Sequence, residues 1–214
     1  FHVYVVSNGI FASARVRGEM QSTHIRQVSL SPAHLGRVAA MNHLSREIAA
    51  GKYTIDEAFE EIGRIRNMPY EPWPLQILAS GVGSACFCYI LGGSVPDSVA
   101  AFISGLVLYL FIPLFQKKKL PKIISNILGS SIAALSGLIL FSLGLGEHAD
   151  KIITGSIIPL VPGVPITTAI RDFMNTDYLS GTIRLIDALL VAFCIAVGVG
   201  FVLILWGAVT GVAV

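Results

Sequence analysis

Three prolines and a glycine interrupt an apolar run in the last third of the chain. Residues 157–166 read IIPLVPGVPI and contain Pro159, Pro162, Gly163 and Pro165. Each proline removes a backbone donor and crowds the preceding turn, so a regular helix does not pass through all three. In hydrocarbon, irregular backbone persists only where it is packed in protein or lines a cavity. The run therefore predicts a broken membrane helix whose free backbone groups meet a solute, with a packed kink that binds nothing as the alternative.

Polar side chains follow the break directly, and they are of types that recognise a carboxylate. Thr167 and Thr168 could donate to such a group, or could bond back to their own helix carbonyls. Arg171 has a planar guanidinium that matches a carboxylate in two parallel hydrogen bonds. It could instead anchor the topology or pair with Asp172. The four residues of the break and these three side chains are the predicted contacts of a solute.

Acidic residues near the hydrocarbon are candidates for proton coupling. Asp172, Asp177 and Asp187 follow the broken run, and residues 188–200 beyond them carry no charge. An ionisable group at such a place is a functional hypothesis by default. Arg184 lies three residues before Asp187 on the same helical face, so a structural ion pair is the alternative. All four are predicted to act in proton coupling or gating.

Composition divides the chain into a soluble part and a membrane part. Mean hydropathy is +0.73, and 13% of residues are charged, against about 25% in soluble domains. Seven of the 13 acidic residues and eight of the 15 basic residues precede residue 72. The net charge of +2 does not indicate a nucleic-acid partner. The three cysteines lie in apolar runs without metal-ligand spacing, and no phosphate-binding loop motif is present, so neither a cofactor nor ATP-driven transport is predicted.

The N-terminal third predicts a small α+β domain. Alternating apolar residues indicate a three-stranded antiparallel meander over residues 2–6, 10–17 and 22–30, with turns at Ser7-Asn8-Gly9 and Gly18-Glu19. Ser31 as N-cap and Pro32 as first helical residue predict a helix that ends at Gly51. Thr54 and Glu57 form a capping box that begins a second helix. Because the chain opens on a phenylalanine inside a strand, the domain is expected to be N-terminally incomplete.

The remaining sequence predicts an α-helical membrane protein with about five transmembrane helices. Residues 68–74 contain three prolines and are predicted to be a non-helical hinge. The hinge separates a cytoplasmic domain, residues 1–72, from a transmembrane domain, residues 73–214. Each apolar run approaches the roughly 20 residues that cross a bilayer. The predicted spans are residues 75–92, 95–115, 123–145, 152–170 (the broken fourth) and 183–207.

Basic residues set the expected orientation. Lys117, Lys118, Lys119 and Lys122 mark the loop between the second and third spans as cytoplasmic. The N-terminus is then cytoplasmic and the C-terminus lies outside. An odd number of spans indicates half of a transporter, which either another subunit or a lost domain completes.

Several segments resemble the bacterial threonine/serine exporter family. The matching residues are 155–165 (GSIIPLVPGVP), 170–172 (IRD), 178–184 (YLSGTIR), 37–46 (RVAAMNHLSR), 53–58 (YTIDEA) and 91–97 (LGGSVPD). The resemblance covers nearly the whole chain, and the proline-rich motif is its most specific part.

The resemblance implies a function, a membrane and a partner. Members of that family are proton-driven exporters of small hydrophilic metabolites such as threonine and serine. A two-component branch exports dicarboxylates such as succinate, and its larger subunit, which this chain resembles, pairs with a small membrane subunit. The implied location is the bacterial cytoplasmic (inner) membrane, as a multi-pass protein in contact with lipid, paired with the small subunit or with further copies of itself.

Two other function classes stay open. The first is a membrane-anchored hydrolase whose soluble domain is catalytic, although no nucleophile elbow or metal motif supports it, so the chain is predicted not to be an enzyme. The second is an uncoupled channel or scaffold subunit, which a flux insensitive to the proton gradient would indicate.

Overall fold

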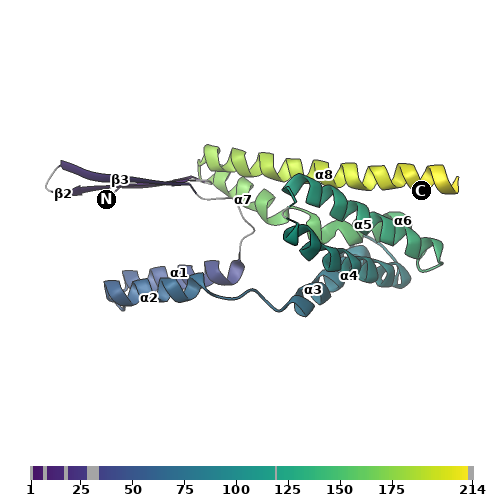
Figure 1. Cartoon of the computed structure of the whole chain (residues 1–214), viewed down its shortest axis with the longest axis horizontal. Helices are drawn as coiled ribbons and strands as arrows, with labels where there is room; N and C mark the ends of the chain where they lie inside the picture. Colours follow the sequence, from purple (N-terminus) through teal and green to yellow (C-terminus); the bar gives the residue numbers. More distant parts are fainter. Residues whose placement is uncertain (1, 7–8, 17–18, 28–33, 119, 212–214) are drawn as a thin grey trace. The chain divides into compact units, whose positions relative to one another are not determined.

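The computed structural model describes residues 2–6, 9–16, 19–27, 34–118 and 120–211 (Figure 1). The chain divides into two compact units, residues 1–72 and residues 73–214. Four helices are long and apolar enough to cross a membrane, and a fifth span is added if one bent pair of helices counts as a single crossing. The expectation of an α-helical protein with four to five apolar helices able to cross a membrane is thereby confirmed by length and composition, and the bent pair lies where the broken fourth span was expected.

The first unit begins with the expected three-stranded meander. Strands β1 (His2–Val6), β2 (Gly9–Val16) and β3 (Glu19–Gln27) pair antiparallel in the order β1-β2-β3. Gly9 and Glu19, expected in turns, belong to strands, and β3 begins earlier than residue 22. The pairing shifts register between Ala14 and Arg15, which lets β3 pair with β2 from Glu19 onward. The other expected turn residues, Ser7, Asn8 and Gly18, lie outside the described residues.

Two helices follow the sheet in the same unit, α1 (Leu35–Ala49) and α2 (Ile55–Arg66). The capping box of α2 is confirmed, since Thr54 and Glu57 exchange backbone and side-chain hydrogen bonds, and the backbone N–H of Thr54 lowers the pKa of the Glu57 carboxyl. The expected start of α1 was wrong. Its N-cap is His34, whose ring accepts from the Arg37 amide, whereas Ser31 and Pro32 lie outside the described residues.

The segment after α2 is held against the start of α1. Arg37 donates twice to the Met68 carbonyl, at 3.2 and 2.6 Å, and its guanidinium lies 5.2 Å from the centre of the Tyr70 ring. The non-helical segment is shorter than expected, because α3 begins at Trp73 and includes Pro74 in its first turn. Proline is tolerated there because the N–H that it lacks would have no partner in the helix.

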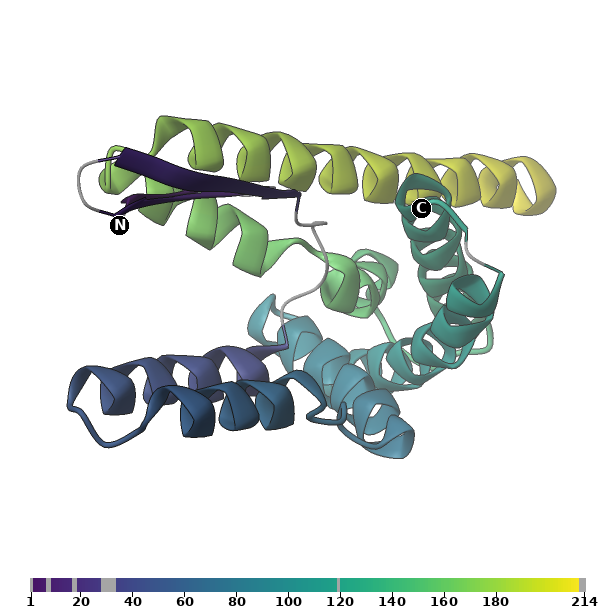
Figure 2. The same cartoon turned by 60° about the vertical axis from the view of Figure 1, so that its left-hand side comes forward.

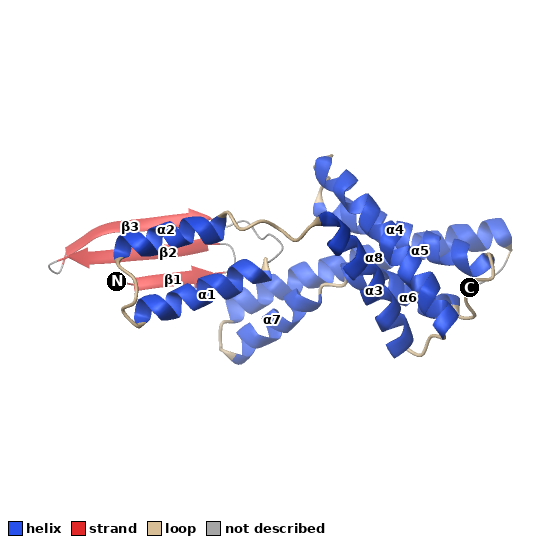
Figure 3. Ribbon diagram, turned by 90° about the horizontal axis from the view of Figure 1, so that it is seen from below, coloured by secondary structure: helices blue, strands red, loops and turns tan. Residues whose placement is uncertain are grey.

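The second unit is entirely helical in its described part (Figure 3). Its elements are α3 (Trp73–Ile90), α4 (Val95–Lys117), α5 (Lys122–Ser142), α6 (Ala149–Ile157), the short 3₁₀ helix η1 (Ile158–Leu160), α7 (Gly163–Met174) and α8 (Tyr178–Thr210). The broken span is α6 with η1 followed by α7, and the two parts are bent by 63°. It covers Ala149 to Met174 and is longer at both ends than the expected residues 152–170.

Helices α5 and α8 run parallel, and their contacts define the depth of the unit. Lys122 pairs with Asp187, and Ser131 donates to the carbonyl of Gly198, so the offset between the helices stays nearly constant. Farther along, Leu138 packs in one core cluster with Val202. The 21 residues of α5 measure about 32 Å, close to the roughly 30 Å of a hydrocarbon core. Lys122 and Asp187 therefore lie at one boundary of the apolar layer.

Helix α7 lies antiparallel to the first half of α8 (Figure 2). A Cβ added to Gly181 would lie 2.9 Å from the ring of Phe173, and Asp172 pairs with Arg184. By this register Thr168 is about level with Asp187. The last residues of α7 and the first turns of α8 therefore extend beyond the boundary, on the side of the lysine-rich loop.

Candidate functional site

The break lies inside the apolar layer, beside α5. A Cβ added to Gly129 would lie 3.3 Å from Leu160, the last residue before the interruption. Gly129 is seven residues after Lys122, which places the break about 10 Å inside the boundary. Pro162 is buried, and Pro159 and Pro165 are partly buried.

Hydrogen bonds between residues two or three apart replace the bonds between residues four apart that the three prolines remove. In a regular helix the amides at positions 159, 162 and 165 would donate to the carbonyls of Gly155, Ile158 and Val161, but proline has no N–H to donate. These carbonyls accept instead from the amides of Ile158, Val161 (3.0 Å) and Gly163 (2.8 Å). The backbone of the break is thus locally satisfied, and a solute would use only the second lone pair of each carbonyl.

The two threonines after the break bond back to their own helix. The Thr167 hydroxyl lies 3.1 Å from the Gly163 carbonyl and 3.0 Å from that of Val164. The Thr168 hydroxyl lies 2.8 Å from the Val164 carbonyl and 3.0 Å from that of Pro165. A hydroxyl has one proton to donate, so each would have to rotate before it could donate to a solute.

Arg171 is at the opposite end of α7 from the break. It is exposed, and it lies eight residues after Gly163, which corresponds to about 12 Å along the helix. Within the described residues it has no ion-pair partner, so the expected alternative of a pair with Asp172 was wrong. About two turns of α7 and more therefore separate the backbone of Arg171 from the break.

The charged residues form two ion pairs that sequence spacing did not indicate. The Nε atom of Arg184 lies 3.2 Å from Asp172, which joins α8 to α7. Both oxygens of Asp187 lie 2.7 Å from the Lys122 amine, which joins α8 to α5. The expected alternative, a pair between Arg184 and Asp187, was wrong because α5 brings Lys122 to the carboxylate. Asp177 caps α8 by accepting from the Ser180 amide at 3.2 Å.

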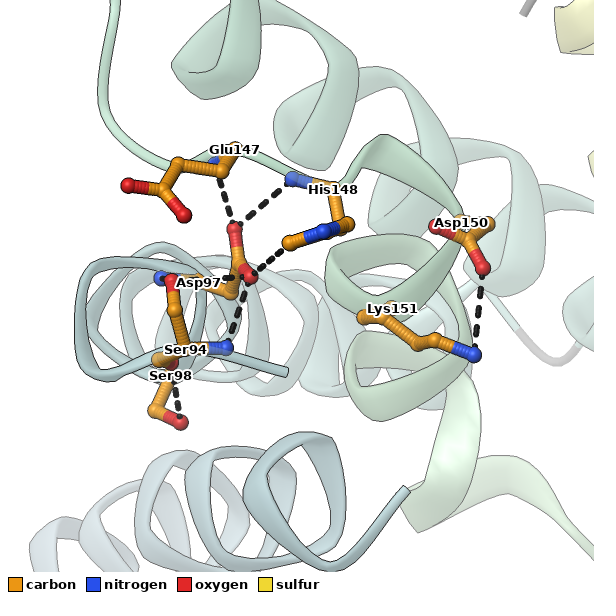
Figure 4. Close-up of polar contacts among 7 residues, drawn as sticks. All are labelled: Ser94, Asp97, Ser98, Glu147, His148, Asp150 and Lys151. Atoms are coloured by element: carbon orange, nitrogen blue, oxygen red, sulfur yellow. Dashed lines mark hydrogen bonds and ion pairs between the residues drawn. The ribbon is translucent and has the colours of Figure 1, made fainter. Parts of the chain in front are cut away.

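One buried carboxylate escaped the sequence-based choice of candidates. Asp97 in the first turn of α4 is fully buried, and the loop before α6 surrounds it (Figure 4). Its oxygens accept from Ser94, Glu147 and His148. The pattern Ser94-x-x-Asp97 before an apolar run is a capping box, and it could have drawn attention to the carboxylate. The contact with His148, 51 residues away, has no signal in the sequence.

The described residues contain no group of His, Cys, Asp and Glu that could hold a metal ion. What they provide is a bent span, an exposed guanidinium, and two ion pairs at the boundary beside the lysine-rich loop. The exposed guanidinium can attract an anion. Protonation of a carboxylate in either ion pair can break that pair, and the interruption between α6 and α7 can serve as a backbone hinge.

Comparison with known proteins gives the family. The ThrE family model, which describes threonine/serine exporters, matches residues 1–206. The chain is 25% identical over 206 residues to the "Threonine/serine exporter" of Corynebacterium glutamicum, with 93% of this chain and 42% of that protein covered. It is 28% identical over 154 residues to the "Probable succinate transporter subunit YjjP" of Escherichia coli, with 72% of this chain and 59% of that protein covered.

A third relative, the "Probable threonine/serine exporter" of Mycobacterium tuberculosis, is 23% identical, with 83% of this chain and 34% of that protein covered. The chain thus spans between about a third and three fifths of the length of these relatives. No solved structure matches it significantly. Because the family match extends over nearly all of its residues, the chain belongs to the threonine/serine exporter family.

Proposed function

We propose that the chain is a subunit of a proton-coupled secondary transporter that exports a small amino acid such as threonine or serine, or a small dicarboxylate such as succinate. The observation that carries the proposal is the span bent by 63° inside the apolar layer, whose second half ends among paired charges. The family match supports transport, and the names of the relatives supply the two solute classes.

The ion pairs form the inner gate of the proposed transporter. Lys122–Asp187 holds α5 to α8, and Arg184–Asp172 holds α8 to α7. A proton on either carboxylate would remove its charge and release the cation that it holds. The break at residues 161–163 then lets α7 move relative to α6. Proton binding at the gate thereby favours one of the two orientations of the transporter.

Arg171 is the proposed first contact of the solute. Its guanidinium is exposed and has no ion-pair partner among the described residues, whereas Lys122 and Arg184 are each paired. A carboxylate of the solute fits that planar fork in two hydrogen bonds. The break lies about 12 Å farther along the helix. The proposed path therefore runs from Arg171 past Thr168 and Thr167 to Pro162, Gly163 and their neighbours Pro159 and Pro165, with Asp177 capping α8 beside it.

Membrane orientation and partner complete the proposal. The lysine-rich loop lies on the side of the gate, and the positive-inside rule supports the proposal that this side faces the cytoplasm at a bacterial inner membrane, with the N-terminus cytoplasmic. The relative from Escherichia coli is named a transporter subunit, which supports a second membrane subunit beside this chain. Further copies of the chain are the other proposed partner.

Replacing Arg171 by alanine is expected to lower the initial rate of export at least tenfold, because the carboxylate of the solute loses the guanidinium that binds it. The rate is measured in vesicles at a solute concentration below saturation, with the amount of inserted protein determined in parallel. Arg64→Ala is the matched control, since Arg64 is an exposed arginine that pairs with Glu61 three residues earlier on α2. Unchanged export by the Arg171 variant would remove this residue from the path.

The function itself is tested by efflux of labelled threonine, serine and succinate from vesicles that contain the full chain. Efflux is followed with and without a small membrane subunit of the two-component type, and with and without an imposed pH gradient. Efflux that depends on the gradient and on the second subunit supports a coupled two-component exporter. Efflux that ignores the gradient indicates a channel, and ester or peptide turnover without efflux indicates a membrane-anchored hydrolase.

A further inference from the structure

Asp97 makes an unusually dense set of contacts at the end of the bundle opposite the gate. One oxygen, Oδ2, accepts from the Ser94 amide (2.8 Å), the Ser94 hydroxyl (2.9 Å) and Nδ1 of His148 (2.9 Å). The other, Oδ1, accepts from the amides of Glu147 (2.6 Å) and His148 (3.0 Å). Figure 4 shows these groups converging on the carboxylate from two separate segments. Because an ionised carboxylate only accepts, Nδ1 of His148 carries the proton.

These contacts join the starts of two helices through one side chain. Ser94 directly precedes α4, and His148 is the N-cap of α6. A carboxylate at a helix N-terminus is favourable because unpaired amides gather there. The loop before α6 is pressed onto it: Gly146 has a φ of +114°, and a Cβ there would lie 2.7 Å from Oδ1 of Asp97. Glycine alone fits that position without strain.

The packing below Asp97 continues the connection toward the break. A Cβ on Gly155 of α6 would lie 2.7 Å from Cβ of Cys88 and 2.8 Å from the Ser84 carbonyl, both in α3. At the gate, by contrast, the joining groups are long side chains, and that of Lys122 is 59% exposed. At the α4–α6 end the accepting carboxylate is fully buried and the His148 side chain is 50% exposed, whereas at the gate both partners of the Lys122–Asp187 pair are partly exposed to water.

We propose that Asp97 is a positioning residue that fixes α6 to α4, so that α3, α4 and α6 move as one body. The hinge of the broken span is then residues 161–163, and the loops around Asp97 stay closed during transport. The inference rests on the proposed function because it says what stays closed during transport. The rigidity of α3, α4 and α6 is a property of the chain itself and can be measured without transport. The charged side chains that follow His148 in the first turn of α6, Asp150 and Lys151, pair with each other at 3.2 Å.

A covalent lock tests whether this end must open. In a Cys86→Ser, Cys88→Ala background, Ser94→Cys and His148→Cys put one thiol on each of the two segments that meet at Asp97, where the present side chains both reach the same oxygen at 2.9 Å. Formation of the disulfide is checked by mass spectrometry without reductant. Oxidation to the disulfide is expected to leave the export rate of the same sample unchanged or to raise it. A loss of export on oxidation that reductant restores would overturn the proposal. If the wild-type chain shows no export in the same vesicles, the proposed function fails instead, and the proposal about Asp97 is left to the hydrogen-exchange test.

Hydrogen exchange of backbone amides tests the proposal without a transport measurement. In the full chain, the amides of Glu147 and His148 are expected to exchange equally slowly with and without threonine, serine or succinate. Asp97→Asn is expected to speed their exchange at least tenfold, whereas His148→Asn, whose amide still donates, should stay within about threefold of wild type. His43→Asn on exposed α1 is the matched histidine control. Faster exchange in wild type on solute addition, or no effect of Asp97→Asn, would overturn the proposal.

Discussion

Replacing Gly155 by alanine is expected to destabilise the membrane unit, although alanine is the better helix former by about 1 kcal/mol. The added Cβ would meet the Ser84 carbonyl and Cα of Cys88, at 2.8 and 3.1 Å. Backbone cannot rotate away from a clash, so α6 must shift from α3. Overpacking of this kind costs about 1–3 kcal/mol. The thermal midpoint of the full chain in detergent is therefore expected to fall.

Gly83→Ala is the matched control, because nothing lies within 4 Å of a Cβ at Gly83 on the same α3 helix. It should leave the midpoint unchanged or raise it, since only the propensity gain remains. Equal midpoints for the two variants would mean that α3 and α6 are not packed as closely as the structure has them. That outcome would also weaken the single moving body proposed for α3, α4 and α6.

Local chemistry is what the sequence predicted well. The capping box at Thr54 and the break at Pro159, Pro162 and Pro165 depend only on neighbours within a few residues. The same local rules were wrong about where two helices, α1 and α3, begin. The His34 ring serves as the cap of α1, and Pro74 enters the first turn of α3, where a missing donor costs nothing.

The sequence did not predict the contacts between helices, and these contacts determine the geometry of the site. Side chains three residues apart on one helix are neighbours, so a pair between Arg184 and Asp187 was the alternative that the sequence offered. The parallel register of α5 and α8 instead supplies Lys122 to Asp187 from 65 residues away. Asp97 shows the same limit: its capping role was visible in the pattern with Ser94, but His148 comes from a loop whose position follows from tertiary packing. Spacing along one helix cannot report the offset between two.

Reversing one charge of the Lys122–Asp187 pair is expected to lower export at least tenfold. Lys122→Asp replaces the amine that now lies 2.7 Å from Asp187 by a second carboxylate, and Asp187→Lys places two cations on the facing helices. Like charges on facing helices repel, so the gate cannot close in its present form. Asp187→Asn keeps the size and loses the charge, and the same loss is expected. Initial rates are compared at equal amounts of inserted protein, with Lys118→Asp in the loop before α5 as the control.

The double variant Lys122→Asp/Asp187→Lys separates two roles that the single variants confuse. If the pair only holds the gate, exchanging the partners restores the attraction, and export should recover to within about threefold of wild type, as coupled neighbours do in a double-mutant cycle. If Asp187 also carries the coupled proton, the carboxylate now sits on α5 and the double variant stays inactive or loses its response to the pH gradient. Normal export by all the single variants would leave Arg184–Asp172 as the remaining candidate gate. Recovery with gradient dependence intact would transfer the proton-carrying role to Asp172, the other carboxylate that holds a cation between helices.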